Sequence, residues 1–364
     1  MSTAADLGIA FGRVAFVMLF VLNLGGLLTW VERKQSAIMQ DRIGANRASI
    51  FGLRLMGLFH PLADAIKMLT KEDFRPARAD RFLFGLAPFV SVFFALVAFA
   101  SIPFGDTLRV AGREVPLQAV TLNVGVLYVF AMLSLGVYGV MMAGWSSGNN
   151  YALLGGQRAA ALMISAEIAI GASIMGVIMI AGSLNMMDIV RAQGRLLGGW
   201  LPLWGIVTQP LAFVLFVTAG IAATKRIPFD MPEGESEIIG YFVEYSGMKF
   251  GMFAMADFLE TVVIAGMTTS LFLGGWQVPY LAADGFHFPW GSTLALPHLA
   301  VTLLQVGSFV FKVIAMIFVL MLIRWTLPRF RYDQAMRLGW LGLFPLAILN
   351  LLITGGVLLL WERP

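Results

Sequence analysis

Long apolar runs recur along the chain, each bounded by charged residues, glycine or proline. Since about 20 apolar residues of helix cross the hydrocarbon core of a bilayer, each run is a candidate membrane span. We expect eight spanning helices, at about residues 13–31, 82–102, 119–142, 158–182, 200–222, 251–275, 298–323 and 338–361. The pattern predicts an all-α polytopic membrane protein, with residues 1–364 in a single integral membrane domain.

Residues 52–70 follow a different pattern. Apolar side chains fall on one helical face of this segment, whereas Asp64 and Lys67 fall on another. Such a segment is typical of an amphipathic helix that lies in the membrane interface. Pro61 should bend this helix or restart it, because proline cannot donate a backbone hydrogen bond.

Basic residues gather on alternate connections. Most of the 25 Lys and Arg residues lie after the first, third, fifth and seventh spans. Because cytoplasmic loops are enriched in Lys and Arg, we expect the loops at about 32–81, 223–250 and 324–337 to face the cytoplasm. Both termini then lie on the opposite side. The same bias accounts for the net charge of +4 without a nucleic-acid partner.

Composition narrows the chemistry further. The chain is 59% hydrophobic and 13% charged, with a mean hydropathy of +0.82, which fits a membrane protein. It contains no cysteine, so it cannot hold a disulfide or a thiolate-ligated iron–sulfur cluster. Its three histidines are scattered, so a histidine metal site is not expected either. Any redox centre must therefore belong to a partner.

The stretch from Thr224 to Gly247 concentrates acidic residues: Asp230, Glu233, Glu235, Glu237 and Glu244. A carboxylate beside a bilayer is costly unless it is paired, protonated or hydrated. If the stretch is helical, Glu233 and Glu237 share a face, and each raises the pKa of the other. The plain alternative is a solvated acidic loop.

The charged segments collect at one surface, whereas a secondary transporter would usually place its charges near the midplane in broken helices. This arrangement favours the docking of a soluble partner. Six motifs carry a resemblance to a known family: ERK…QDRIGANR, HPLADAIKMLTKED, GWSSGNNYALLG, IPFDMPEGESEIIGYFVEYSGMKFG, LFLGGW and LPRFRYDQAMRLGW.

In this order and spacing, from Glu32 to about Asn350, the motifs resemble the H subunit of bacterial NADH:quinone oxidoreductase, respiratory complex I. Its mitochondrial counterpart is NADH dehydrogenase subunit 1. The resemblance implies a translocase subunit without a redox centre, not catalytic alone. Such a subunit joins the peripheral and membrane arms, forms much of the quinone cavity and starts the charged path that couples quinone reduction to proton translocation.

The resemblance also implies a substrate, partners and a location. The substrate is a quinone, either ubiquinone or menaquinone, and neither FMN nor an iron–sulfur cluster is bound by this chain. The partners are the peripheral-arm iron–sulfur and quinone-site subunits, other membrane-arm subunits and the lipid bilayer, with no nucleic acid. The location is the bacterial inner (cytoplasmic) membrane. The acidic stretch is expected to form a loop and short helices against the membrane surface.

Five residues are expected at the quinone cavity by this resemblance: Arg33, Arg42, Asp64, Lys67 and Arg324. Each also has a plain explanation. Arginines at cytoplasmic helix ends are ordinary topology signals. Asp64 and Lys67, one turn apart, could form a surface pair of little energetic value.

Six residues are expected on the proton path: Glu167, Glu233, Glu235, Glu237, Asp257 and Lys312. Glu167 lies inside the fourth span, where an ionisable group is a functional candidate by default, although it could merely tie two helices together. Asp257 or Glu260 could be its partner. Lys312, inside the seventh span, could instead extend its ammonium group to an interface.

Several positions depart from the family pattern. Ala45 replaces a proline, Ala166 stands where a Tyr commonly precedes the buried Glu, and Asp257 stands where Glu is typical. Ala223 stands where many members carry another Glu. A continuous carboxylate path must therefore pass Ala223 by water, or use Glu167, Asp257 and the group at 233–237 alone.

Two other functions remain open. One is the membrane anchor of an ion-pumping hydrogenase, which has no quinone; the intact motifs around Arg42, Lys71 and Arg331 weigh against it. The other, from a different class, is a stand-alone secondary transporter. Gene neighbourhood and purification in a large assembly would separate the three hypotheses.

Overall fold

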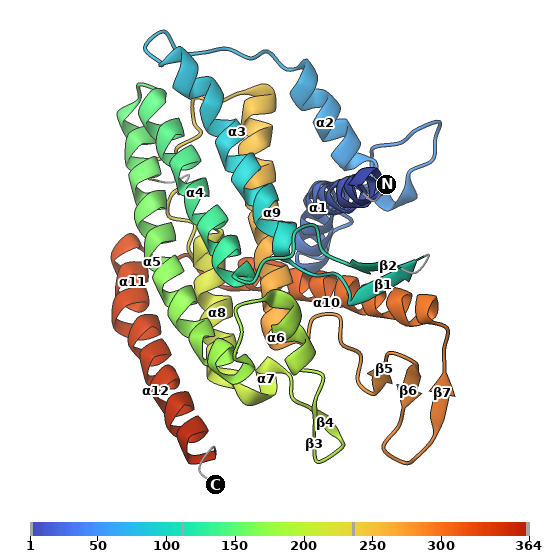
Figure 1. Ribbon diagram of the computed structural model, residues 1–364. Coiled ribbons are helices and arrows are strands. Elements are labelled where there is room, and N and C mark those ends of the chain that lie inside the picture. Colours follow the sequence, from blue (N-terminus) through green and yellow to red (C-terminus); the bar gives the residue numbers. More distant parts are fainter. Residues whose placement is uncertain (1–2, 111–112, 235–236, 362–364) are drawn as a thin grey trace.

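The computed structural model describes residues 3–110, 113–234 and 237–361 (Figure 1). Its longer helices are α1 (Thr3–Met39), α3 (Arg81–Ala98), α4 (Gly125–Ser146), α5 (Asn150–Ala181), α8 (Pro210–Ala223), α9 (Gly247–Phe272), α10 (His298–Thr326) and α12 (Phe344–Trp361). Its shorter helical segments are η1 (Leu55–Gly57), α2 (His60–Thr70), η2 (Phe99–Ser101), α6 (Met186–Ala192), α7 (Gly205–Thr208), α11 (Tyr332–Arg337) and the π-helical turn η3 (Leu338–Leu343).

The strands are short and confined to connections between helices. They are β1 (Thr107–Val110), β2 (Arg113–Pro116), β3 (Leu196–Leu197), β4 (Leu201–Pro202), β5 (Leu281–Ala282), β6 (Gly285–His287) and β7 (Thr293–Ala295). All pairings are antiparallel, in the orders β1-β2, β3-β4 and β5-β6-β7. The predicted all-α class is confirmed.

Within the described residues, seven helical stretches are long and apolar enough to cross a bilayer. They are Asp6–Met39, Arg81–Ser101, Gly125–Ser146, Asn150–Ala181, Gly247–Phe272, His298–Thr326 and Tyr332–Leu360. They correspond to seven of the eight predicted spans, and the chain is a multi-pass membrane protein.

The predicted span at 200–222 is wrong in extent. Its helix, α8, begins only at Pro210 and has 14 residues, which gives about 21 Å at 1.5 Å per residue. Gln209, just before it, has a non-helical backbone (φ −138°, ψ 57°) and separates α8 from the single turn of α7. The cause is Pro210, which starts a helix well but cannot continue one.

The helices α3, α4, α5 and α9 run alongside one another, and α12 lies against α5 (Figure 1). α10 crosses this group steeply and contacts both α1 and α9. Small residues bring α3 and α4 together: a Cβ on Gly139 would lie 2.8 Å from the Ser91 backbone nitrogen. Such close approach is how helices associate in a bilayer, where apolar area alone gives little preference for another helix over lipid.

The predicted amphipathic segment at 52–70 is a helix that restarts at proline. Pro61 occupies the first turn of α2, after the separate turn η1. Apolar side chains of α2, including Leu62, Ile66 and Leu69, are exposed in the isolated chain. They offer the apolar face that an interfacial helix requires.

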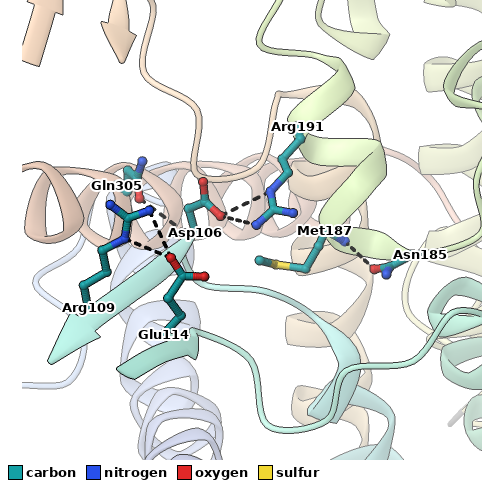
Figure 2. Close-up of polar contacts among 7 residues, drawn as sticks. All are labelled: Asp106, Arg109, Glu114, Asn185, Met187, Arg191 and Gln305. Atoms are coloured by element: carbon teal, nitrogen blue, oxygen red, sulfur yellow. Dashed lines mark hydrogen bonds and ion pairs between the residues drawn. The ribbon is translucent and has the colours of Figure 1, made fainter. Parts of the chain in front are cut away.

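Polar contacts fasten the connections that carry the strands (Figure 2). Arg191 of α6 donates from Nη2 to Asp106 Oδ1 at 2.6 Å, and the Asp106 backbone N–H donates to Gln305 of α10 at 3.3 Å. Across the β1–β2 hairpin, Arg109 and Glu114 are register partners and form an ion pair of 3.0 Å. The Asp106 contacts fix the start of the hairpin against α6 and α10, and the Arg109–Glu114 pair joins its two strands.

The acidic connection between α8 and α9 is made of turns wherever it is described, so the expected short helices are wrong there. Its backbone is held from outside: the Phe330 N–H donates to the Pro228 carbonyl at 2.9 Å, and the Phe229 and Phe330 rings stack with centroids 5.4 Å apart. Tertiary contacts with the segment after α10 therefore replace helical hydrogen bonds.

Candidate functional site

A charged cavity of about 150 Å³ lies where α1, α9, α10 and the acidic connection meet. Three of the predicted cytoplasmic segments contribute to it, although they lie far apart in the sequence. Its lining consists of Glu32, Lys225, Arg226, Ile227, Asp230, Glu233, Ala254, Asp257, Phe258 and Arg324. Seven of these ten residues are ionisable, which is exceptional beside a membrane span.

Glu32 bridges two arginines at this cavity. Its Oε1 lies 2.7 Å from Arg324 Nη1, and its Oε2 accepts from Arg226 Nη1 at 3.2 Å. The Arg226 guanidinium also stacks 4.3 Å from the centre of the Phe258 ring. Because all three charged side chains are largely shielded from water, this bridge is stronger than an exposed ion pair.

Lys225 also lines this cavity and lies between two carboxylates of α9. Its Nζ is 3.0 Å from Asp257 Oδ1 and 2.9 Å from Glu260 Oε2. Burial alone would lower the pKa of Lys225, but the charges of Asp257 and Glu260 outweigh it and raise the pKa above its ordinary value. Lys225 is therefore charged at neutral pH.

The acidic connection contributes two carboxyl groups. Asp230 accepts from Arg329 at 2.6 Å, yet burial still raises its pKa. Glu233 is open to the cavity but otherwise surrounded by protein. Burial, followed by the nearby charges of Asp257 and Asp230, raises the pKa of Glu233 well above its ordinary value. The surroundings of Glu233 therefore favour its protonated form.

The five residues expected at the quinone cavity do not all lie at one site. Only Arg324 lines the charged cavity. Arg33 pairs with Asp64 at 2.7 Å and ties α1 to α2, so Asp64 contacts Arg33 rather than Lys67. Lys67 is exposed, and Arg42 donates to Gln40 at 2.6 Å on the surface.

The residues expected on the proton path also lie at different places in the fold. Glu233 and Asp257 line the cavity. Glu237 instead forms an exposed ion pair with Arg158 at 2.6 Å. The condition under which Glu233 and Glu237 would share a helical face is not met, because the described part of this connection is not helical. Glu235 lies outside the described residues.

Two further residues of that set lie elsewhere in the fold. Glu167, on α5, accepts a hydrogen bond of 2.7 Å from Ser134 of α4. Lys312, on α10, donates to the backbone carbonyls of Leu273, Gly275 and Gln277 at 2.8, 3.0 and 2.6 Å. The Lys312 ammonium group thus provides hydrogen bonds to the carbonyls just after the end of α9.

Sequence reasoning did not assign four of the cavity residues to the site, namely Glu32, Lys225, Arg226 and Asp230, and it named Glu260 only as an alternative partner of Glu167. One signal was present, because Asp257 and Glu260 are three residues apart and therefore share a helical face. Another was the Lys225–Arg226 pair at the start of an acidic stretch.

Among the described residues, no group of three or more His, Cys, Asp or Glu is placed to hold a metal ion.

Comparison with known proteins gives a consistent result. The family model described as NADH dehydrogenase matches residues 12–355. The first of the NADH-quinone oxidoreductase H subunits of Geobacter metallireducens is 45% identical over 358 residues, which cover 98% of each chain. The H subunit of Thermomicrobium roseum is 45% identical over 94% of each chain. The second H subunit of Rhizobium meliloti is 41% identical over 98% of this chain and 99% of its own.

Proposed function

Since the chain belongs to the NADH dehydrogenase family, we propose that it is the membrane subunit that couples quinone reduction to proton translocation in an NADH:quinone oxidoreductase of the bacterial inner membrane. In this proposal the chain joins the peripheral and membrane arms and forms much of the quinone-binding cavity. Electrons reach the quinone from partner subunits, because a chain without cysteine cannot hold a cluster by thiolates.

The charged cavity is the observation that carries the proposal. Reduction of a quinone to a quinol takes up protons as well as electrons, so it needs proton donors within reach. Glu233, whose pKa is raised, can hold such a proton, and Arg324 can donate hydrogen bonds to a quinone oxygen. We assign the proton-path role to Glu233, Asp257 and Glu167.

The segment around α2 supplies an apolar approach to this site. The Arg33–Asp64 pair holds α2 against α1, and the exposed apolar side chains of α2 can accompany a hydrophobic quinone tail. In the proposal Arg33, Arg42, Asp64 and Lys67 lie along the rim of this approach.

Replacement of Arg324 by Met tests the function. The change keeps length but removes the charge and the donors, so it should lower the rate of NADH:quinone reduction while NADH oxidation by an artificial acceptor stays near the wild-type rate. Arg109→Met, which removes an exposed Arg–Glu pair from the β1–β2 hairpin, is the control for loss of an arginine and should leave both rates unchanged.

The two assays separate the outcomes. Equal loss of both rates in Arg324→Met would indicate failed assembly, in which case quinone binding is measured on the residual complex. Wild-type quinone reduction by a fully assembled Arg324→Met complex would overturn the role of the cavity. Purification of the chain with hydrogenase subunits instead would overturn the function itself.

A further inference from the structure

The apolar helix α8 is too short to reach across a bilayer core. Its 14 residues give about 21 Å, whereas the core measures roughly 30 Å. α8 ends at Ala223, two residues before Lys225 of the charged cavity. The missing length therefore lies before its first residue, Pro210, on the side of the membrane away from that cavity. The connection that precedes α8, residues 193–209, lies at the level of this second leaflet.

The β3–β4 hairpin in this connection presents apolar side chains outward, at the end of the helix group remote from α2 (Figure 1). Gly198 and Gly199 both have positive φ, 60° and 79°, which glycine adopts without strain, and with Trp200 they form the turn. Trp200 is 64% exposed, and Leu197 and Leu201 on either side of the turn are exposed as well. Exposed Trp and Leu side chains are typical of a segment that lies in the membrane interface.

A second cavity, of about 110 Å³, lies next to this hairpin, between α5, α6 and α7. Val177 and Ile180 of α5, Ile189 of α6 and Leu203 line it with apolar side chains. Ile180 is also exposed on the surface of α5, so the cavity adjoins the apolar outer surface of the chain. Cavities that enclose a whole small-molecule ligand measure about 300–1,000 Å³, so this one can take only part of a molecule. An alkyl chain whose remainder lies in the membrane fits this description.

Two polar side chains of the lining are occupied within the protein. Gln193 Oε1 accepts from the Gly205 backbone N–H at 3.0 Å, and Gln193 Nε2 donates to the Ser270 carbonyl at 2.8 Å. The Thr208 hydroxyl donates to the Gly205 carbonyl at 3.4 Å. Because these groups already have partners, the interior of the cavity suits an apolar occupant.

Arg195 adds a positive charge to the lining. Its side chain is exposed, and no carboxylate among the described residues lies within ion-pair distance of it. The neighbouring Arg191, by contrast, is paired with Asp106 at 2.6 Å, and Asp188 of α6 accepts from Ser183. A guanidinium group is always charged, and its fork of N–H donors matches the oxygens of a phosphate. Arg195 can therefore bind an anionic group from outside the chain.

We propose that Arg195 and the apolar cavity bind one phospholipid of the leaflet that lies away from the charged cavity. One acyl chain enters the cavity between α5, α6 and α7, Arg195 donates hydrogen bonds to the lipid phosphate, and Trp200 lies at the level of the headgroups. A headgroup with a net negative charge, as in phosphatidylglycerol, is preferred because it neutralises Arg195. The site is independent of the quinone reaction, and the bound lipid fills the leaflet beside the start of α8.

Photocrosslinking in the assembled complex tests this site. The complex is reconstituted in phosphatidylcholine vesicles with a trace of either phosphatidylglycerol or phosphatidylcholine that carries a diazirine at the end of one acyl chain. Residues 177–208 should be labelled about fivefold more by the phosphatidylglycerol probe, the preference that one basic side chain gives at an anionic lipid surface. The exposed apolar face of α12 is the internal reference, and both probes should label it equally.

Two variants separate the parts of the site. Arg195→Gln removes the charge, so the preference for phosphatidylglycerol should disappear, whereas Arg109→Gln on the β1–β2 hairpin is the control and should keep it. Ala192→Leu places a larger side chain in the cavity lining, so labelling of residues 177–208 by both probes should fall while labelling of α12 stays the same.

An unchanged preference in an assembled Arg195→Gln complex would overturn the proposal. If that variant fails to assemble, the wild-type complex still decides: equal labelling of residues 177–208 by the two probes, or no labelling of them because another subunit covers the cavity, would also overturn it. Inorganic phosphate, added at matched ionic strength, should leave the preference unchanged. Loss of the preference would indicate a site for a free phosphate ion instead of a lipid.

Discussion

Glu32 Oε1 and Arg324 Nη1 lie 2.7 Å apart, although their helices, α1 and α10, stand near opposite ends of the sequence. The other oxygen of Glu32 contacts Arg226 at 3.2 Å. One carboxylate thus holds two guanidinium groups, from α10 and from the acidic connection, at one wall of the charged cavity. Loss of its charge would leave two cations facing each other.

Glu32→Gln should therefore weaken this wall. A hydrogen bond to a charged group contributes about 1.5–3 kcal/mol, so we expect a stability loss of about 2 kcal/mol together with slower quinone reduction. Thermal unfolding of the purified complex and the quinone reductase assay measure the two effects. Glu114→Gln, which affects an exposed pair, should change neither, and a Glu32→Gln complex as stable as wild type would contradict the role of the bridge.

Glu167→Gln should preserve assembly and lower coupled activity. Glutamine can still accept the hydrogen bond from Ser134, so the contact between α4 and α5 survives while the titratable group is removed. The measurements are quinone reductase activity and pH-gradient formation in reconstituted vesicles. Wild-type values of both would assign Glu167 to a helix tie instead.

Ala223→Glu is to be combined with Glu167→Gln in a double variant. It introduces a carboxyl group two residues before Lys225. If the site hydrates the new group, Ala223→Glu should partly restore pH-gradient formation to the Glu167→Gln variant. No restoration in a fully assembled double variant would show that position 223 does not communicate with Glu167.

Lys312→Met separates two roles of this lysine. The change removes three hydrogen bonds to carbonyls after the end of α9, so stability should fall by about 2–4 kcal/mol. Thermal unfolding is measured beside pH-gradient formation per assembled complex. A fall in stability with a normal gradient assigns Lys312 to the end of α9, whereas a lost gradient at wild-type stability assigns it to the proton path.

The raised pKa of Glu233 predicts a pH dependence of stability. The folded protein holds this proton more tightly than the unfolded chain, whose carboxyl group titrates near 4.5. The resulting stabilisation is complete below that pH and is lost as the pH rises through the folded pKa. Glu233→Gln cannot ionise, so its melting temperature should decline less than that of wild type over this rise. If the melting temperatures of the two proteins fell in parallel as the pH rises, the raised pKa of Glu233 would be refuted.

Arg42→Cys tests the docking surface, because the chain has no other cysteine. Arg42 is exposed in the isolated chain, and we expect the introduced thiol to crosslink to a peripheral-arm subunit in the intact complex. Arg109→Cys, on the β1–β2 hairpin, should not crosslink to that arm. Free labelling of position 42 by a soluble thiol reagent in the assembled complex would disprove docking at this surface.

Local patterns in the sequence were sufficient for most of the fold. A long apolar run is a strong local signal, so seven predicted spans correspond to long helices. The restart at Pro61 follows from proline chemistry alone. The same chemistry acts at Pro210, but the apolar run continues across that residue and conceals the break.

The site was less predictable because it depends on contacts between distant segments. No local pattern relates Glu32 to Arg324. The turns around Pro228 are held by the segment after α10, and this tertiary contact separates Glu233 from Glu237. The family motifs identified the three segments that meet at the cavity. Which charged side chains form ion pairs there could be seen only in the structure.

The 29 residues of α10 make a rod about 43 Å long, more than the roughly 30 Å of a bilayer core. Its first residue, His298, accepts from the Arg109 N–H of the hairpin at Nε2, and its last turn carries Arg324. It contains no proline, and its one glycine, Gly307, is followed by Ser308, a pair at which helices can kink. A displacement of the Arg324 end would therefore be transmitted along α10 to its contact with the β1–β2 hairpin, unless the helix bends at this pair.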